Sequence, residues 1–426
     1  MNRIKRLTGE GAWIIVGQII SVSGALLLVR ILTEYLDPAQ YGQMALALTI
    51  AGLVTQVATG GVISAIGRYY AIASEKGNFY NYIRASVKLM WYATLVVIAI
   101  GLILSIGLVA TGQSQWLGLT AAVLVFSILS GYYSALVGIQ NAARHRAVVA
   151  LHGGMDALLK IILVTGIVLW VSSTSTSVVF GYALSALLVT ISQLFFLRRL
   201  LSRHEDFNHT QSSQSWVNQM WLFSWPMAAS GLFNWGYYAS QRWALELFVS
   251  TDDVGKFYAL TQIAYSPISM AGGMFLSMLT PILYARAGDG ENHQRIANVR
   301  GIVYKLAALG VAATLLMAGI TFLLHDVIFK ILVADQYHDM SVYMPSIVVA
   351  SGLLQVSFAL AIYVTSQNKT RLFLLFNVVS NSIVIILNFV MTWLYGIEGL
   401  IYSMIIGSLL HLLWMLRIVL KLNIVR

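Results

Sequence analysis

The sequence contains no cysteine, and charged residues make up only 10% of its 426 positions. The absence of cysteine excludes disulfides, thiolate metal sites and cysteine nucleophiles. The scarcity of charge, together with a hydrophobic content of 58% and a mean hydropathy of +0.78, excludes a soluble domain. The alternation of apolar and polar residues that a membrane β-barrel requires does not recur along the chain. The composition therefore predicts an all-α polytopic membrane protein.

Long apolar runs mark the membrane-spanning helices, because each span needs roughly 20 apolar residues to cross the bilayer. The first run is too long for a signal peptide and leads directly into a second one, so we interpret it as an uncleaved span. Twelve spans are predicted in all. They lie near residues 11–32, 43–66, 89–109, 117–139, 148–171, 177–197, 220–248, 256–284, 303–324, 342–366, 372–395 and 398–417.

The basic residues predict the orientation of these spans. If the spans alternate in direction, 21 of the 26 Lys and Arg residues fall on one side, and only Lys256 and Lys330 fall on the other. The side rich in basic residues is cytoplasmic by the positive-inside rule, which places both termini in the cytoplasm. The same rule accounts for the net charge of +10, so this charge requires no nucleic-acid partner.

A polar connection near the middle of the chain separates two halves. The connection covers residues 198–218 and is the longest between predicted spans. It divides an N-terminal lobe, residues 1–197, from a C-terminal lobe, residues 219–426. Each lobe has six predicted spans, so both lobes enter the membrane from the cytoplasm.

The two lobes also share landmarks at a constant offset. Arg30 and Arg242 are separated by 212 positions (242 − 30 = 212), and Gly42 and Gly255 by 213 (255 − 42 = 213). Such a repeat indicates an internal duplication. Two parallel repeats predict two six-helix lobes around a central cavity, an arrangement suited to alternating access.

Three stretches of the sequence resemble a known family. "RILTEYLDPAQYG" at 30–42 and "GGVISAIGRYYA" at 60–71 are similar to the opening signature of polysaccharide flippases of the MOP (multidrug, oligosaccharidyl-lipid, polysaccharide) superfamily. "SQRWALELFVSTDDVGKFYALTQ" at 240–262 is similar to the matching signature of their second lobe. This chain has Gln241 where the family often carries an acidic residue.

The resemblance implies a flippase of the bacterial cytoplasmic (inner) membrane. Its substrate would be a polyprenyl-diphosphate-linked oligosaccharide, an O-antigen or related surface-glycan repeat unit, moved by alternating access. Membrane lipids, a coupling proton or sodium ion and other glycan-assembly membrane proteins would be its partners. The resemblance implies neither a cofactor nor a resident metal.

Two other functions are weighed against this one. A cation-coupled multidrug antiporter of the same superfamily needs a net acidic interior. In this sequence the basic residues within the spans outnumber the acidic ones: they are Lys160, Arg30 and Arg242 compared with Asp156 and Glu246. A membrane glycan polymerase or ligase needs a catalytic outer loop. The largest outer loop is short and has no cluster with metal-ligand spacing, so we expect no catalytic residues.

Lys160 is the most informative charge within the spans. It lies 12 residues into the predicted helix from Val148, about 18 Å along its axis and close to the membrane midplane. Asp156 precedes it by one turn on the same face. The two side chains either form a pair that locks helix packing, or provide a cationic site for a diphosphate that Asp156 tunes.

Arg30 and Arg242 lie near the outer ends of the first helices of their lobes. Each arginine has two possible roles. In a structural role, its side chain extends to the membrane interface or pairs with a carboxylate such as Glu34 or Glu246. In a functional role, it binds pyrophosphate or closes a gate. Their recurrence against the positive-inside trend favours a shared task.

A polar stripe surrounds Arg242. Asn234, Tyr238 and Arg242 are spaced at i, i+4 and i+8 on one helix face, Glu246 continues the stripe, and Gln241 falls within the same arc. We predict Asn234 and Tyr238 as cavity residues, and Gln241 and Glu246 as gating or coupling residues.

Arg68 and Arg286 occupy corresponding places after the second helix of each lobe. Topology alone accounts for basic residues there. A basic inner mouth would also attract an anionic headgroup, so both arginines are candidates for gating.

Overall fold

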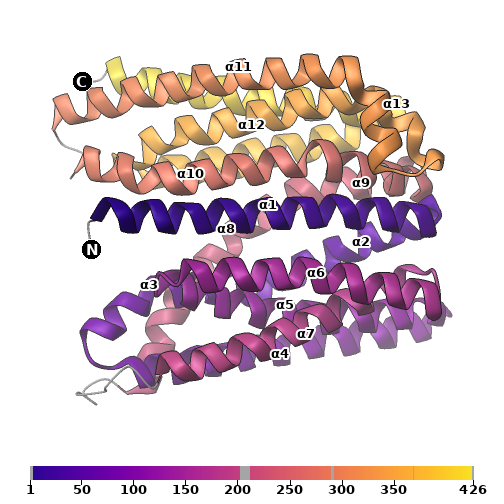
Figure 1. Ribbon diagram of the computed structural model, residues 1–426, viewed down its shortest axis with the longest axis horizontal. Coiled ribbons are helices and arrows are strands. Elements are labelled where there is room, and N and C mark those ends of the chain that lie inside the picture. The colour runs from indigo at the N-terminus through magenta and orange to yellow at the C-terminus, as the bar shows by residue number, and fades with distance from the viewer. Residues whose placement is uncertain (1–2, 202–211, 289–291, 368, 425–426) are drawn as a thin grey trace. The chain divides into compact units, whose positions relative to one another are not determined.

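The computed structural model describes residues 3–201, 212–288, 292–367 and 369–424. Every regular element within these ranges is a helix (Figure 1). The prediction of an all-α chain is therefore confirmed. Helices of this length satisfy their own backbone hydrogen bonds, as a chain in a bilayer must.

Contacts divide the chain into two compact units. Unit 1 comprises residues 1–24 and 43–235, and unit 2 comprises residues 25–42 and 236–426. The divisions fall inside the first helix of each sequence half. Residues 25 and 236 are separated by 211 positions (236 − 25 = 211), which is close to the offset of the sequence repeat.

Unit 1 contains most of the first sequence half, without residues 25–42, and also the first part of α8 (Ser213–Phe248) up to Trp235. In this unit α7 packs against both α5 and α6, and α3 packs against α5. The helices of the first half are α1 (Arg3–Tyr35), α2 (Pro38–Val54), the π-helical η1 (Thr55–Gly60), α3 (Gly61–Glu75), α4 (Phe79–Ala110), the 3₁₀ segment η2 (Ser114–Trp116), α5 (Leu117–Ala142), α6 (Arg146–Trp170) and α7 (Ser175–Leu201).

Unit 2 contains most of the second sequence half, with α8 only from Gly236 onward, and also residues 25–42 of the first half. In this unit α12 packs between α11 and α13 and is the most buried of the apolar helices. The helices of the second half are α8 (Ser213–Phe248), α9 (Thr251–Ala264), α10 (Ser266–Ala287), α11 (His293–Leu332), the 3₁₀ segment η3 (Asp335–Tyr343), α12 (Met344–Thr365) and α13 (Thr370–Ile424).

The number of spans agrees with the sequence once two helices are considered. Ten stretches of the described residues are long and apolar enough to cross a membrane. One of them contains both halves of α13, which departs from helical geometry at Gly396, where φ is +59°. The 36-residue α8 is long enough but is less apolar than these ten. With α13 divided and α8 included, the described chain has the twelve spanning segments predicted.

Part of the predicted connection between the lobes can be described. α7 ends at Leu201 and α8 begins at Ser213, whereas residues 202–211 lie outside the described residues. Trp216, on the first turn of α8, is fully buried among aromatic side chains of unit 1, with its ring centroid 6.1 Å from that of Tyr82. The start of α8 is thereby anchored to α4.

Small residues bring α1 and α6 together in unit 1. A Cβ built on Gly17 would lie 2.9 Å from the Cβ of Ala150, and one built on Gly24 would lie 2.9 Å from the Cβ of Ala157. Both pairs are seven residues apart, so they lie on one face of each helix. Small residues at such positions let membrane helices approach closely. This packing fixes the position of the α6 segment that carries Asp156.

The two repeated glycines, Gly42 and Gly255, lie where α2 and α9 cross closely in unit 2. A Cβ on Gly42 of α2 would lie 2.0 Å from the carbonyl oxygen of Thr251 on α9. A Cβ on Gly255 of α9 would lie 2.0 Å from the carbonyl oxygen of Pro38 on α2. Only glycine allows two helices to cross this closely. The glycine of each signature therefore serves the fold.

The end of α1 is capped by η3. The last carbonyls of a helix have no partner within the helix. The Tyr337 hydroxyl donates to the carbonyl of Leu36 at 2.9 Å, and the Gln336 amide donates to the carbonyls of Thr33 and Leu36 at 3.1 and 3.0 Å. These bonds fix the segment that carries Arg30.

Candidate functional site

Asp156 and Lys160 form an ion pair on α6. The Lys160 Nζ donates to Asp156 Oδ2 at 2.7 Å, and the Ser185 hydroxyl of α7 donates to Asp156 Oδ1 at 2.9 Å. The Lys160 ammonium also lies over the ring of Tyr182 on α7, 5.5 Å from its centroid. Both carboxylate oxygens are thus occupied, and the carboxylate is held in one orientation.

The lysine of this pair retains unused donors. An ammonium group has three N–H donors, and Asp156 is its one acceptor among the described residues. The Lys160 side chain is 26% exposed and that of Asp156 is 16% exposed. The geometry is therefore compatible with both interpretations of the pair: it stabilises packing, and it presents donors that an anion can bind.

Arg30 forms structural contacts within unit 2. Its guanidinium donates to the backbone carbonyl of Val333, directly after the end of α11. It also forms an ion pair with Glu34 one turn later, at 3.0 Å. The pair with a nearby carboxylate is the arrangement that the sequence left open as an alternative to a gate. The Arg30 guanidinium thus lies at the C-terminal end of α11, where the helix dipole favours a positive charge.

Arg242 has different surroundings. Its guanidinium lies over the face of Tyr258 on α9, 4.4 Å from the ring centroid. Tyr258 is in turn 5.2 Å from Tyr41, and Tyr41 is 5.8 Å from Tyr337 in an edge-to-face arrangement. A cation over an aromatic face is stabilised by the ring quadrupole. The two repeat-related arginines therefore have unlike partners, although their positions in the sequence correspond.

The polar stripe of α8 is divided between exposed and buried residues. Asn234 and Tyr238 are exposed, and the Tyr238 hydroxyl accepts from the hydroxyl of Tyr265, the residue between α9 and α10, at 3.4 Å. Gln241 is buried, and its Nε2 has no hydrogen-bond partner among the described residues. Glu246 accepts from the Thr251 hydroxyl at 3.0 Å through one oxygen, and its other oxygen is buried without a partner in the described part of the chain.

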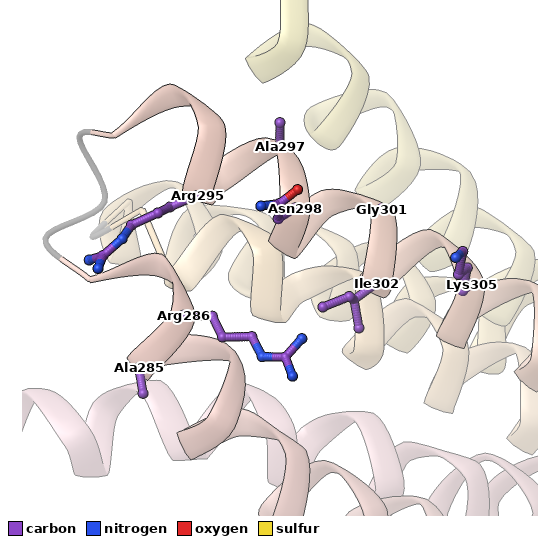
Figure 2. A pocket seen from close by; sticks show the side chains of 8 residues that line it. All are labelled: Ala285, Arg286, Arg295, Ala297, Asn298, Gly301, Ile302 and Lys305. Carbon is purple, nitrogen blue, oxygen red and sulfur yellow. The ribbon is translucent and has the colours of Figure 1, made fainter.

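Arg68 and Arg286 lie on exposed helix surfaces. Arg68 is on α3 in unit 1, and Arg286 is on the last turn of α10 in unit 2. Arg286 lines a pocket of about 710 Å³ together with residues of α11 (Figure 2). Of the basic residues of this pocket, the sequence pointed to Arg286 alone. The positive-inside rule accounts for Arg295 and Lys305, so neither gave a separate signal.

Some partners in the site had only a weak sequence signal. Tyr182 and Ser185 are three residues apart on α7 and face the Asp156–Lys160 pair. A tyrosine and a serine in an apolar helix at that spacing mark a polar face, but which helix they meet is not readable from spacing. No group of three or more His, Asp or Glu residues suited to a metal occurs within the described ranges.

The fold is shared with solved membrane transporters. The lipid II flippase MurJ, in an inward closed conformation, matches with a TM-score of 0.70 and 12% identity over 96% of this chain and 87% of its own. The MATE multidrug transporter DinF-BH, in complex with R6G, matches with a TM-score of 0.65 and 14% identity over 98% and 95%. An outward-facing multidrug resistance MATE family transporter of the MOP superfamily matches with a TM-score of 0.60 and 12% identity over 97% of each chain. Among curated proteins, none matches this sequence.

These matches define the class as a multi-pass helical membrane protein with the fold of the MOP superfamily. The model of the family described as polysaccharide biosynthesis protein matches residues 7–284, more than half of the chain. The chain belongs to this family, and the resemblance noted in its signatures is confirmed.

Proposed function

We propose that the protein is a flippase that moves a polyprenyl-diphosphate-linked oligosaccharide from the cytoplasmic to the periplasmic leaflet of the bacterial inner membrane. The observation that carries this proposal is the Asp156–Lys160 pair, whose lysine has donors to spare within a spanning helix. A cation within a span is costly and usually serves function. The polysaccharide biosynthesis family and the fold shared with a lipid II flippase support a glycan-lipid substrate.

In this proposal Lys160 binds the diphosphate of the substrate. A diphosphate crossing the membrane loses its hydration, and charge-assisted hydrogen bonds from an ammonium group compensate for part of that loss. Asp156 holds the ammonium in position, and Ser185 in turn orients the Asp156 carboxylate. The polyprenyl tail stays in the lipid while the sugars cross through the polar interior by alternating access. An O-antigen or a related surface-glycan repeat unit is the proposed cargo.

The substrate class is tested in liposomes that contain the purified protein. The probe is a polyprenyl-diphosphate trisaccharide with a fluorophore on the sugar, and dithionite added outside quenches outward-facing label. We expect protein-dependent exposure of label that initially faced inward, and no proton-driven uptake of a cationic dye. Uptake of the dye without movement of the glycolipid would support the antiporter and overturn the flippase. Consumption of the lipid with formation of longer glycans would instead indicate a polymerase.

The proposed orientation is tested by cysteine labelling, which the natural absence of cysteine makes direct. We expect Ser114→Cys and Ser172→Cys to react with an impermeant thiol reagent in intact spheroplasts, and Ser74→Cys and Ser212→Cys to react only after the membrane is opened. All four positions are exposed. The reason is the crowding of basic residues on the inner side. Labelling of Ser212→Cys from outside would contradict cytoplasmic termini and the parallel arrangement of lobes.

A further inference from the structure

A pocket between α10 and α11 in unit 2 gathers uncompensated positive charge. Its lining includes Arg286 of α10 and Arg295, Asn298 and Lys305 of α11, and none of the lining residues is acidic (Figure 2). Within the described ranges, none of the three basic side chains forms an ion pair with a carboxylate. Three cations around one hollow repel one another unless an anion binds between them.

The pocket is built to hold these charges. Gly288 ends α10 with φ +67°, and a Cβ at this position would lie 2.6 Å from Nη1 of Arg295. The glycine therefore lets the Arg295 guanidinium lie against the chain at the mouth of the pocket. Arg286 extends into the space between the two helices (Figure 2). Small residues such as Gly301 leave the volume of about 710 Å³ open.

The hollow is also bordered by apolar surface. Ile302 lines it, and the exposed apolar side chains Ile282 and Leu309 lie one turn beyond Arg286 and Lys305 respectively. Ile282 is 51% exposed and Leu309 is 67% exposed. A cationic pocket adjoined by exposed apolar side chains suits an amphiphile with a negative headgroup and hydrocarbon chains, rather than a small soluble anion.

We propose that this pocket binds the phosphate headgroup of an anionic glycerophospholipid of the inner leaflet, with its acyl chains along Ile282 and Leu309. Arg286 and Arg295 provide planar forks that match phosphate oxygens, and Lys305 adds a point charge. Basic pockets between helices on the cytoplasmic side of membrane proteins have this chemistry. The site is distinct from the Asp156–Lys160 pair, and it concerns a resident lipid rather than the transported one.

The test measures lipid binding by native mass spectrometry of the purified full-length protein, with phosphatidylglycerol and phosphatidylcholine as probes. We expect phosphatidylglycerol to bind preferentially. In the double variant Arg286→Gln/Lys305→Gln its affinity should fall at least about tenfold, which corresponds to about 1.4 kcal/mol. The matched control Arg84→Gln/Arg371→Gln removes two exposed basic residues outside the pocket and should bind as the wild type does.

A second variant tests the pocket without changing its charge. No atom lies within 4 Å of a Cβ built on Gly301, so a side chain can start there, and the leucine of Gly301→Leu should occupy the hollow and weaken phosphatidylglycerol binding. Equal binding by wild type and both pocket variants would overturn the proposal, as would equal binding of the two lipids. Binding of farnesyl diphosphate to the pocket without binding of phosphatidylglycerol would assign the site to the diphosphate substrate and overturn the assignment to a resident lipid. Glycolipid translocation, measured in parallel, reports separately on the flippase proposal.

Discussion

Lys160→Met is expected to lower the rate of glycolipid translocation at least about tenfold while the protein remains folded. The substitution keeps the length of the side chain but removes the ammonium donors that the proposed function assigns to the diphosphate. A hydrogen bond to a charged group contributes roughly 1.5–3 kcal/mol, and about 1.4 kcal/mol corresponds to tenfold. The measurement is the rate at which the fluorescent label becomes accessible to dithionite in liposomes that contain equal amounts of protein. Lys160→Arg, which keeps the charge, should retain part of the rate.

The control for this prediction separates binding from packing. Removal of Lys160 leaves the Asp156 carboxylate partly buried, with only the Ser185 hydroxyl as a partner. This uncompensated charge destabilises the α6–α7 contact even if Lys160 has no role in binding. Asp156→Asn/Lys160→Met removes both charges, so it should recover thermal stability without recovering translocation. Recovery of translocation in the double variant would show that the pair serves packing alone.

A matched substitution elsewhere controls for the loss of any Lys–Asp pair. Lys330 and Asp326 on α11 have the same i, i+4 spacing at 2.9 Å, and both are more than half exposed. An exposed pair contributes little to stability. Lys330→Met should therefore leave both stability and translocation close to wild type. A similar loss in both lysine variants would contradict a specific role for Lys160.

Gly42→Ala and Gly255→Ala are each expected to lower the melting temperature of the purified protein by about 2–12 °C. Each added methyl would meet a backbone carbonyl oxygen of the opposite helix at 2.0 Å, so α2 and α9 must separate. Overpacking of this kind costs roughly 1–3 kcal/mol, and each kcal/mol shifts the midpoint of a domain of 150–250 residues by about 2–4 °C. The melting temperature is measured in detergent by heating samples to a series of temperatures and quantifying the folded protein that remains by size-exclusion chromatography.

Two comparisons sharpen this prediction. Gly273→Ala on α10 places the same methyl where no atom lies within 4 Å, so it should leave the melting temperature unchanged or raise it slightly. The double variant Gly42→Ala/Gly255→Ala should be less harmful than the sum of the single ones, because both methyls separate the same two helices. Strict additivity, or unchanged melting in both single variants, would show that the crossing of α2 and α9 is not close in the folded protein.

The fold class could be predicted from the sequence because the bilayer acts on each residue separately. Apolar runs long enough to span and the uneven distribution of Lys and Arg are properties of local segments. They indicated an all-helical membrane protein, and the signatures around Arg30, Arg68 and Arg242 indicated the superfamily. The hydropathy of α8 is low, yet its polar stripe with Asn234 and Tyr238 was still recognisable as a spanning helix from its length and repeat position.

The site could be predicted only in part. The Asp156–Lys160 pair followed from its i, i+4 spacing, because two residues one turn apart on a helix are neighbours in any fold. Its partners Tyr182 and Ser185 could not be assigned, since they come from another helix. Likewise, equal places in the repeat suggested one task for Arg30 and Arg242. Both lie in unit 2, but Arg30 contacts Val333 and Glu34, whereas Arg242 lies over the ring of Tyr258.

The sequence by itself determined that this chain is a multi-pass helical membrane protein of a polysaccharide biosynthesis family, and it predicts an internal duplication. The tertiary structure alone decided that Arg30 meets the carbonyl of Val333, 303 positions away, that Gly42 and Gly255 mark one helix crossing, and that Arg286 and Lys305 share a pocket. Hydropathy and charge determine whether a segment crosses the membrane. Which segments then touch depends on the packing of side chains distant in the sequence, and no local pattern encodes it.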